Sequence, residues 1–362
     1  MIAMSPESLG GGALCGGILN LFHDVVSVSN LLAAWNEFKR GKRKKRDVAL
    51  FELHLENNIF QLHRELSAKT YVHGPYADFY ICDPKRRHIH KASVRDRVVH
   101  QAIFRVLYPL FDKHFIFDSY SSRTEKGTYA GVGRLQHSCR KVSNNWRTQA
   151  YALKCDVRKF FDSIDHGILH ALIAKKITDP DLLWLVDILF RSFAKAPGKG
   201  LPLGNVTSQL FANVYLNELD QFVKHELKAK YYFRYCDDFV TLHTDRLFLE
   251  DALCKVAVFL REKLLLELHP LKVEIRKVHQ GIDFLGYVVL PHTLVLRTST
   301  KKRLLRKVKE ARREFTEGKT TQETLSALIA SCLGVLSHAR SSKIKGEIER
   351  LLHRASYGGL NV

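Results

Sequence analysis

Two acidic residues between two short apolar runs strongly constrain the fold of this chain. Residues 231–235 and 239–243 have the composition of strands, and they flank Cys236-Asp237-Asp238. Strands this close together predict a β-hairpin with both acids at its tip. A third run, residues 150–157, has the pattern of a buried strand and carries Asp156 near its end. Because strand ends present side chains to a common surface, we expect Asp156 and the two hairpin acids to converge.

Three converging carboxylates repel one another unless a cation neutralises them. Mg²⁺ suits such a site because it binds a few carboxylates and completes its shell with water and substrate phosphates. Two such ions about 3.5–4 Å apart would stabilise the attacking and leaving oxygens of an in-line phosphoryl transfer. An Asp-Asp pair taken alone more often lies in a solvated turn. The strand that ends near Asp156, and further motifs in order around it, favour the metal site.

The chain carries a large excess of positive charge. Its 57 Lys+Arg residues exceed its 37 Asp+Glu residues by 20 over 362 residues, and its pI is near 9.6. Hydrophobic residues at 46% and charged residues at 26% are ordinary for a globular protein and exclude disorder, collagen and coiled coil. A folded chain this basic is expected to bind a polyanion. The positive charge concentrates at 39–46, 85–97 and 301–313, so binding should weaken steeply with salt.

A membrane partner is not expected. The longest apolar stretch near the start, Ala13–Phe22, contains two glycines and an asparagine and is too short to span a bilayer. The seven cysteines include no CxxC pair, so neither a disulfide framework nor a zinc knuckle is indicated, and we expect a cytoplasmic protein. The 18 histidines include no HExxH or similar metal spacing, so most are expected to be solvated or in the core.

Helices and strands alternate without a strict βαβ repeat, which favours an α+β fold over a doubly wound sheet. Extended runs are also expected at 71–72 and 79–81, with a strand pair around 272–289. Ser29 is a candidate cap for the first helix within residues 25–70. Thr207 or Ser208 is a candidate cap for the long helix over 208–228. Helices are expected over 25–70, 95–117 as far as Pro109, from about 165, 181–193, 208–228, 247–265 and in the C-terminal 70 residues.

Several motifs resemble those of reverse transcriptases, and from about residue 50 to residue 300 they follow the order of that family. Tyr235-Cys236-Asp237-Asp238 resembles the YxDD box, and residues 156–162 resemble the first catalytic motif, an Asp followed by an aromatic pair. Residues 203–209 resemble the block that opens the helix under the nucleotide. The remaining similarities are to the lysine-bearing motif (269–272), the primer-grip hairpin (281–287) and the fingers motifs (85–87 and 95–99).

The resemblance implies an RNA-directed DNA polymerase with a right-hand fold, which consists of fingers, a palm with an antiparallel sheet, and a helical thumb. In the thumb, an apolar stripe of Leu304, Val308, Ala311 and Phe315 would lie beside a basic face that follows a duplex backbone. A merely solvated charged face is the alternative. The implied parts are a flexible leader (1–24), fingers (25–100 and 166–203), palm (101–165 and 204–292) and thumb (293–362).

The resemblance also implies two Mg²⁺ ions, with Mn²⁺ as an alternative metal. The implied ligands are Asp156, Val157, Asp237 and Asp238, with Asp238 in an assisting role. Lys272 would protonate the leaving pyrophosphate as a general acid, or only neutralise it. A solvated surface lysine is the alternative interpretation of Lys272.

A further set of residues is implied to bind the incoming nucleotide. Phe161 matches the aromatic steric gate, whose flat ring under C2′ leaves no room for a hydroxyl; a core position beside Phe160 is the alternative. Arg87 has a planar fork that suits a triphosphate, whereas Lys85 shares this task or faces solvent. Gly204 would let the backbone approach the template–nucleotide pair closely. The full implied set is Lys85, Arg87, Phe161, Leu203, Gly204, Ser208 and Gln209.

Other implied contacts lie along the nucleic acid, whose expected components are a template RNA and an RNA–DNA duplex, with dNTPs as substrates. The implied primer grip is Phe284, Leu285 and Gly286. The implied nucleic-acid contacts are Arg95, Arg97, Lys302 and Arg306.

Two departures from the general pattern narrow the type. Leu203 and Gln209 stand where many retroviral-like and intron-encoded enzymes have Gln and Pro. The pattern at these positions resembles that of the reverse transcriptases of diversity-generating retroelements. The stretch 30–35, before the Lys/Arg run, resembles the same group of enzymes. That family copies a template-repeat RNA with frequent errors opposite adenine, and the cDNA replaces a variable repeat in a target gene. The resemblance implies a bacterial or phage-encoded enzyme with a small basic, oligomeric accessory protein.

Two alternatives remain at this stage. A defence-associated or group II intron-derived reverse transcriptase would share the chemistry but differ in biological role. A catalytically silent RNA-binding scaffold with a polymerase fold belongs to a different functional class, and the intact Asp156, Asp237 and Asp238 argue against it. Phe161 disfavours an RNA-dependent RNA polymerase.

Overall fold

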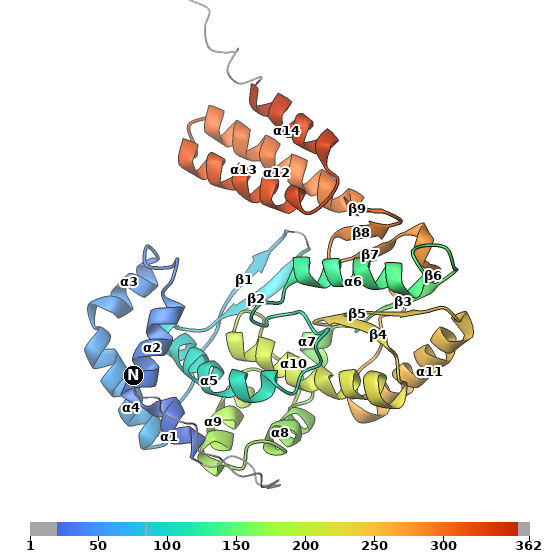
Figure 1. Cartoon of the computed structure of the whole chain (residues 1–362). Coiled ribbons are helices and arrows are strands. Elements are labelled where there is room, and N and C mark those ends of the chain that lie inside the picture. The colour runs from blue at the N-terminus through green and yellow to red at the C-terminus, as the bar shows by residue number, and fades with distance from the viewer. Residues whose placement is uncertain (1–19, 84, 354–362) are drawn as a thin grey trace, which may run out of the picture.

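The protein combines helices with small antiparallel sheets, as a computed structural model describes it over residues 20–83 and 85–353 (Figure 1). The α+β class predicted from the sequence is confirmed. Of the expected leader, residues 1–19 lie outside the described residues, and residues 21–24 belong to the first helix. None of the described helices is long and apolar enough to cross a membrane. The six cysteines in this part of the chain are free thiols.

The described elements have the following bounds. The helices are α1 (Leu21–Val26), α2 (Val28–Phe38), α3 (Arg46–Leu53), α4 (Leu55–Ser67), α5 (Val94–Asp112), α6 (Thr128–Val142), α7 (Phe160–Ser163), α8 (His166–Ala174), α9 (Pro180–Arg191), α10 (Val206–Gln221), α11 (Arg246–Lys263), α12 (Thr298–Thr316), α13 (Gln322–Ser337) and α14 (Ser342–His353). The strands are β1 (Ala77–Ile81), β2 (Arg87–Lys91), β3 (Tyr151–Asp156), β4 (Tyr231–Tyr235), β5 (Asp238–His243), β6 (Glu274–Lys277), β7 (Ile282–Phe284), β8 (Tyr287–Leu290) and β9 (Thr293–Leu296).

Four antiparallel strands form a sheet in the order β4-β5-β3-β6, which we call the palm sheet. Because side chains alternate along a strand, its two faces have separate cores. Tyr232 and Phe239 join the larger apolar cluster with α10 and α11, whereas Phe233 and Val240 join a second cluster with α6. Helices therefore cover both faces of the sheet (Figure 1). The sequence prediction did not include α6.

The N-terminal helices surround a buried Trp35 and pack on α5. Most of the helix predicted over residues 25–70 is formed, but turns over 39–45 and at His54 divide it, and it ends at Ser67. Ser27, and not the predicted Ser29, caps α2 by accepting from the Asn30 N–H. Helix α5 also continues through Pro109 to Asp112. Its buried face extends to Phe111 beyond the proline, so packing retains the last turn despite the missing N–H.

The strands β1 and β2 form a two-stranded hairpin, the fingers hairpin, which rises from the fingers toward the C-terminal helices (Figure 1). Every residue of β1 is exposed to solvent. At its tip, Asp83 forms an ion pair with Lys307 of α12 and lies 3.9 Å from Arg303. The expected strand at 71–72 is not formed.

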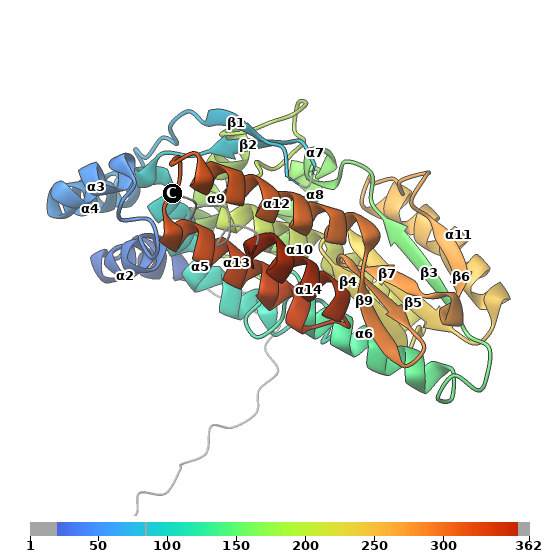
Figure 2. The same cartoon turned by 90° about the horizontal axis from the view of Figure 1, so that it is seen from above.

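The C-terminal part begins with a separate three-stranded sheet, β7-β8-β9, followed by α12, α13 and α14. Because β9 pairs with β8, residues 293–296 belong to this sheet, and the thumb helices begin at Thr298 instead of residue 293. Figure 2 shows the three helices from above, where they lie across the molecule. Of the expected apolar stripe on α12, Leu304 and Val308 are buried, but Phe315 is 38% exposed.

A buried ion pair fixes the strand that leads to the two hairpin acids. Arg234 in β4 donates Nε and Nη2 to the two carboxylate oxygens of Asp220 in α10, at 2.7 and 2.6 Å, and both side chains are fully buried. Arg234 Nη1 also donates to the Asn213 side chain and to the Cys236 carbonyl, at 3.2 and 3.1 Å. Bidentate pairing of this kind gives the guanidinium one orientation.

A second polar cluster fixes the start of α10. His100 of α5 is buried, with Nδ1 2.6 Å from the Thr207 hydroxyl, and its Nε2 accepts from the Asn205 amide at 3.1 Å. Burial, and then the neighbouring His73, lower the pKa of His100 to about 3. The predicted cap is wrong, because Thr207 and Ser208 lie inside α10 and Asn205 occupies the cap position without a side-chain cap bond.

We expect Arg234→Met to lower the free energy of unfolding by about 3–5 kcal/mol, because Asp220 is left buried and unpaired. The measurement is urea unfolding of the full chain. The control is Arg246→Met, which removes an exposed pair with Glu250 and should cost no more than about 0.5 kcal/mol. Equal losses in the two variants would contradict the anchoring role of Arg234.

The low pKa of His100 predicts that the folded protein loses stability at acidic pH. The folded state keeps His100 neutral, while the unfolded chain takes up a proton near its ordinary pKa of 6.5. Stability is therefore lost as pH falls below about 6.5, by about 1.4 kcal/mol per pH unit down to the folded pKa. Urea unfolding between about pH 6.5 and pH 5 should show this slope reduced in His100→Gln and retained in His170→Gln. Parallel pH profiles for all three proteins would count against it.

Candidate active site

The palm sheet brings two of the predicted acids directly opposite each other. β3 and β5 pair antiparallel with Asp156 opposite Asp238, so both side chains lie on the same face of the sheet. Asp237 and Cys236 form the two-residue turn between β4 and β5. Cys236 adopts φ +55°, a left-handed conformation that favours glycine, which is local strain of the kind that gathers at functional sites. The Val157 N–H donates to the Asp237 carbonyl at 3.2 Å and ties the two segments together.

Burial makes negative charge costly at these aspartates. Burial and then the Asp156 carboxylate raise the pKa of Asp237. Burial also raises the pKa of Asp238 to about 7, against the opposing effect of Lys154. Lys272 donates to Asp156 Oδ1 at 2.7 Å, and Lys154 Nζ lies 3.8 Å from Asp238 Oδ2. The two lysines therefore supply part of the positive charge that the carboxylates require.

The residues present fit a divalent metal. The Asp238 Oδ1 atom is buried and has no hydrogen-bond partner among the described residues, which is costly for an oxygen that could otherwise accept from a cation. The three aspartates do not, however, form a cluster with one oxygen of each within 4.8 Å of the others; the described residues contain such a group only on the fingers hairpin. Both opposed aspartates have a lysine beside them, Lys272 at Asp156 and Lys154 at Asp238. The assignment of Asp156 and Asp237 as principal ligands, with Asp238 assisting, stays a prediction.

A cleft of about 550 Å³ opens at the aspartates. It brings together all the predicted catalytic side chains and the whole predicted nucleotide-binding set, which come from both halves of the chain. The predicted residues that line it are Lys85, Arg87, Asp156, Phe161, Leu203, Gly204, Ser208, Gln209, Asp237, Asp238, Lys272 and Leu285.

The two adjacent phenylalanines of α7 have different surroundings. Phe160 is 2% exposed and belongs to the core, although it touches the cleft, whereas Phe161 is only partly buried and lines the cleft. Their rings are 5.4 Å apart and nearly perpendicular. Phe161 is therefore not only a core residue. Its ring is available to a ligand in the cleft.

The segment before α10 lies against the fingers hairpin. The Leu203 carbonyl accepts from the His90 N–H at 3.0 Å. Gly204 has φ +134°, and a Cβ there would lie 3.0 Å from the His90 carbonyl oxygen. Gly204 thus permits a close approach to the backbone of β2, and it also lines the cleft. Its approach to a template–nucleotide pair stays a prediction. Ser208 is buried in the first turn of α10 and Gln209 is exposed.

The three consecutive basic residues of the fingers hairpin, residues 85–87, have different surroundings. Lys85 and Arg87 are exposed and line the cleft. Arg86 between them stacks on the Tyr80 ring, with 4.2 Å from the guanidinium carbon to the ring centroid. Two of the three cations therefore face the cleft, and the third packs on the hairpin.

Arg95 and Arg97, which the sequence predicts as nucleic-acid contacts, both form ion pairs with acids of this chain. Arg95 forms ion pairs with Glu65 and Asp96 and stacks on Tyr71. Arg97 is mostly buried, and it donates to Asp47 at 2.9 Å. Their charges are paired inside the fingers, away from the lining of the cleft. Lys302 and Arg306 of α12 are exposed, as the prediction requires.

The predicted primer-grip residues form the β7–β8 turn. Phe284 is fully buried, Leu285 (φ +52°) lines the cleft, and Gly286 (φ +87°) completes the turn. Lys154 donates to the Asp283 carbonyl at 2.8 Å, so one lysine joins this turn to Asp238. The sequence prediction missed Lys154. Its place two residues before Asp156, and so on the same strand face, was a signal that could have identified it.

Comparison with known proteins agrees with this geometry. Residues 82–289 match the family described as reverse transcriptase (RNA-dependent DNA polymerase). The chain is 28% identical to protein YkfC of Escherichia coli over 180 residues, which is 46% of this chain and 45% of that protein. It is 26% identical to the group II intron-encoded protein LtrA of Lactococcus lactis over 189 residues, 49% of this chain and 30% of that protein.

A third relative is an uncharacterized 91 kDa protein in the cob intron of Schizosaccharomyces pombe, 30% identical over 146 residues, 38% of this chain and 17% of that protein. The chain thus spans less than half the length of these three relatives. The family match covers more than half of the chain and includes the palm sheet, the cleft and the three aspartates. The chain belongs to the reverse transcriptase family.

Proposed function

We propose that the protein is an RNA-directed DNA polymerase that adds deoxynucleotides to a primer paired with template RNA. One observation carries the proposal: three aspartates, an aromatic ring and cations from the fingers line a single cleft on a palm sheet. Asp156, Asp237 and the Val157 carbonyl would hold Mg²⁺, or Mn²⁺, with Asp238 assisting. The bound metal would lower the cost of negative charge on the attacking and leaving oxygens.

The other cleft residues complete the binding of substrate. Lys85 and Arg87 project into the cleft from the fingers and would contact the triphosphate, with Arg87 suited to bidentate contacts. Phe161 would lie under the sugar and exclude a 2′-hydroxyl. Lys272 is held at Asp156 and would neutralise or protonate the departing pyrophosphate. Leu285 would contact the primer end.

The exposed basic face of α12 would follow the backbone of the RNA–DNA duplex. Lys302 and Arg306 lie on this exposed face. The net charge of +20 supports the same partner, since counterion release makes such binding strong and dependent on salt.

In its biological role, we propose that the enzyme acts in a diversity-generating retroelement of bacterial or phage origin. Support comes from Leu203 and Gln209 in the cleft, where the residues differ from the Gln and Pro of many intron-encoded enzymes. An aliphatic side chain offers no hydrogen-bond donor to the nucleotide, so selection depends on packing, which discriminates poorly. This role includes copying of a template-repeat RNA with errors at adenine, and an oligomeric basic accessory protein.

A group II intron-derived role is the second candidate, and the intron-encoded relatives favour it. A defence-associated role shares the same chemistry. A repeat pair in the flanking DNA that differs mainly at adenines would support the retroelement role, and its absence would support the other two.

Primer extension on an RNA template with dNTPs and Mg²⁺ tests the polymerase proposal. We expect Asp237→Ala to lower the rate by at least about 10³-fold, equivalent to about 4 kcal/mol of transition-state stabilisation. The loss of activity would not be due to unfolding. Burial of the Asp237 carboxylate is unfavourable, so its removal should leave the free energy of unfolding unchanged or higher. Asp187→Asn, at an exposed acid on α9, should retain full activity. Activity that survives in Asp237→Ala would refute the assignment of Asp237 as a metal ligand. An inactive wild-type protein would support the alternative of a catalytically silent RNA-binding scaffold.

Leu203→Gln tests the basis of the error bias. The Leu203 backbone is held by its bond to His90, so the side chain can change without moving the segment. We expect the variant to misincorporate less often opposite template adenine, as measured by sequencing cDNA made on one RNA. Leu203→Met, which adds no donor, should keep the wild-type spectrum. An unchanged spectrum in Leu203→Gln would show that this side chain does not set the bias.

A further inference from the structure

The face of the fingers hairpin that carries Arg86 and Tyr80 also carries two histidines and an aspartate. Asp78 in β1 is paired with His90 in β2, and Tyr80 with His88, so all four side chains lie on one face of the two strands. The His88 and His90 rings are 4.3 Å apart, and Tyr80 stacks on His88 at 4.6 Å.

The carboxylate of Asp78 contacts both imidazoles. Asp78 Oδ1 lies 2.6 Å from His90 Nδ1, and Asp78 Oδ2 lies 3.6 Å from His88 Nε2. One donor atom from each of the three residues lies within 4.8 Å of the other two. A tetrahedral ion with ligands at about 2.0–2.1 Å separates neighbouring donor atoms by about 3.3 Å, and the two observed distances lie on either side of this value. Small side-chain rotations would therefore suffice to accommodate an ion.

We infer that Asp78, His88 and His90 form a second metal site, for a transition-metal ion of the Zn²⁺ type. Two imidazoles and a carboxylate suit Zn²⁺, whereas Mg²⁺ prefers oxygen ligands alone. His90 is 9% exposed and held by Phe193 at 4.5 Å, so one ligand is fixed in place. The Asp78 side chain is 51% exposed, which leaves a fourth position for water.

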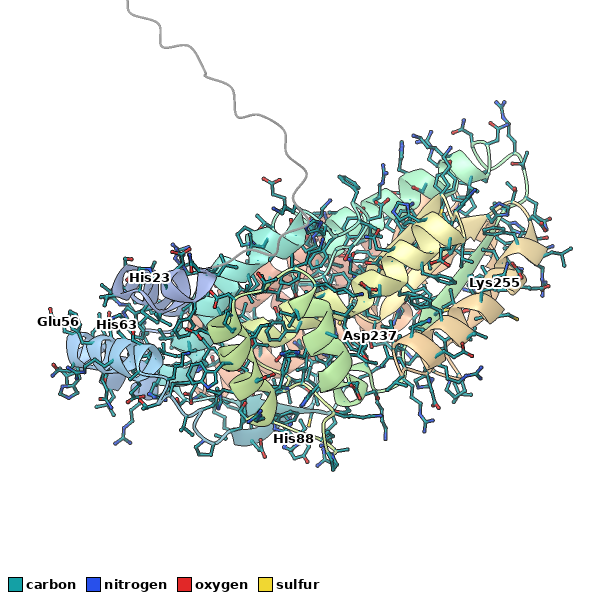
Figure 3. The ribbon with its side chains drawn as sticks, turned by 90° about the horizontal axis from the view of Figure 1, so that it is seen from below. His23, Glu56, His63, His88, Asp237 and Lys255 are labelled. Carbon is teal, nitrogen blue, oxygen red and sulfur yellow. The ribbon has the colours of Figure 1, made fainter. Side chains whose placement is uncertain are left out.

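The site is separate from the aspartate cleft. None of its three residues lines the cleft, whereas their neighbour Arg87, whose side chain alternates to the other face of β2, does. Figure 3 shows His88 at the outer edge of the fingers and Asp237 toward the middle of the molecule. The inference therefore does not depend on the proposed polymerase activity.

A metal at this position would stabilise a hairpin that has little other packing. All of β1 is exposed and β2 is buried only at His90, and an isolated two-stranded hairpin is at best marginally stable in water. An ion shared by Asp78 of one strand with His88 and His90 of the other cross-links the two strands. It would thereby limit the motion of Lys85 and Arg87, which the same hairpin holds at the cleft.

Zinc retention by the full chain tests the site. The protein is dialysed against Zn²⁺ with a large excess of Mg²⁺ to occupy oxygen-only sites, and bound zinc is then measured. We expect wild type to retain one equivalent of zinc and His88→Gln to bind at least about 100-fold more weakly, since loss of a ligand should exceed the effect of losing an outer-shell partner. The matched control is His170→Gln, another half-exposed histidine that faces one aspartate, Asp187, and it should retain zinc as wild type does.

A second measurement covers the case in which a variant folds poorly. Hydrogen exchange over residues 77–91 should slow when Zn²⁺ is added to wild type and should not respond in His88→Gln or Asp78→Asn. Thermal unfolding without metal should show that both variants fold. Zinc retention by wild type no greater than by His88→Gln, or equal loss in His170→Gln, would overturn the site. The three side chains would then be a hydrogen-bonded cluster only.

Discussion

β3 and β5 pair antiparallel in a register that sets Asp156 opposite Asp238, and the site depends on this pairing. Like charges at directly opposed positions destabilise a strand pair, and here burial adds a further cost. Lys272 and Lys154 offset part of the repulsion from either end of the pair. The buried Arg234–Asp220 pair fixes β4 and the Cys236 carbonyl, and so prevents the hairpin from turning its acids outward. A divalent cation would supply the charge that the lysines do not.

The fingers and the palm meet at the backbone of residues 203–204. The bond from His90 to the Leu203 carbonyl and the close fit at Gly204 join β2 to the start of α10. Below this junction, His100 and Asn205 are buried and hydrogen-bonded to each other. Movement of the fingers hairpin would therefore be transmitted to the segment that carries Leu203 and Gln209. Both side chains line the cleft, so the position of the hairpin and the shape of the cleft are physically linked.

The sequence predicted the acidic hairpin, the strand that ends at Asp156 and the composition of the cleft, because strand alternation and motif order constrain these strongly. It did not reveal features that depend on partners distant in the chain. Arg95 and Arg97 belong to a basic segment, but their acids, Glu65 and Asp47, come from helices whose placement no local pattern reveals. Helix α6 was missed although its apolar face packs on the palm sheet. Among the three residues predicted as the primer grip, only the fold shows that Leu285 lines the cleft, whereas Phe284 is buried.

Several basic residues of the predicted nucleic-acid-binding segments are paired with acids of this chain, which narrows where nucleic acid can bind. Lys39 and Arg43 both pair with Glu52, and Arg303 and Lys307 face Asp83 at the tip of the fingers hairpin. This last contact joins the thumb to the fingers, and a duplex that binds along α12 must compete with Asp83 for these cations. The hairpin thus meets the thumb at its tip and the substrate cleft on one face, while β1 is exposed along its whole length. The contacts of His90 with Leu203 and Phe193 hold the hairpin at its base, and Asp83 holds it at the tip. An ion bound at Asp78, His88 and His90 would add a third constraint on Lys85 and Arg87, the two cations that line the cleft.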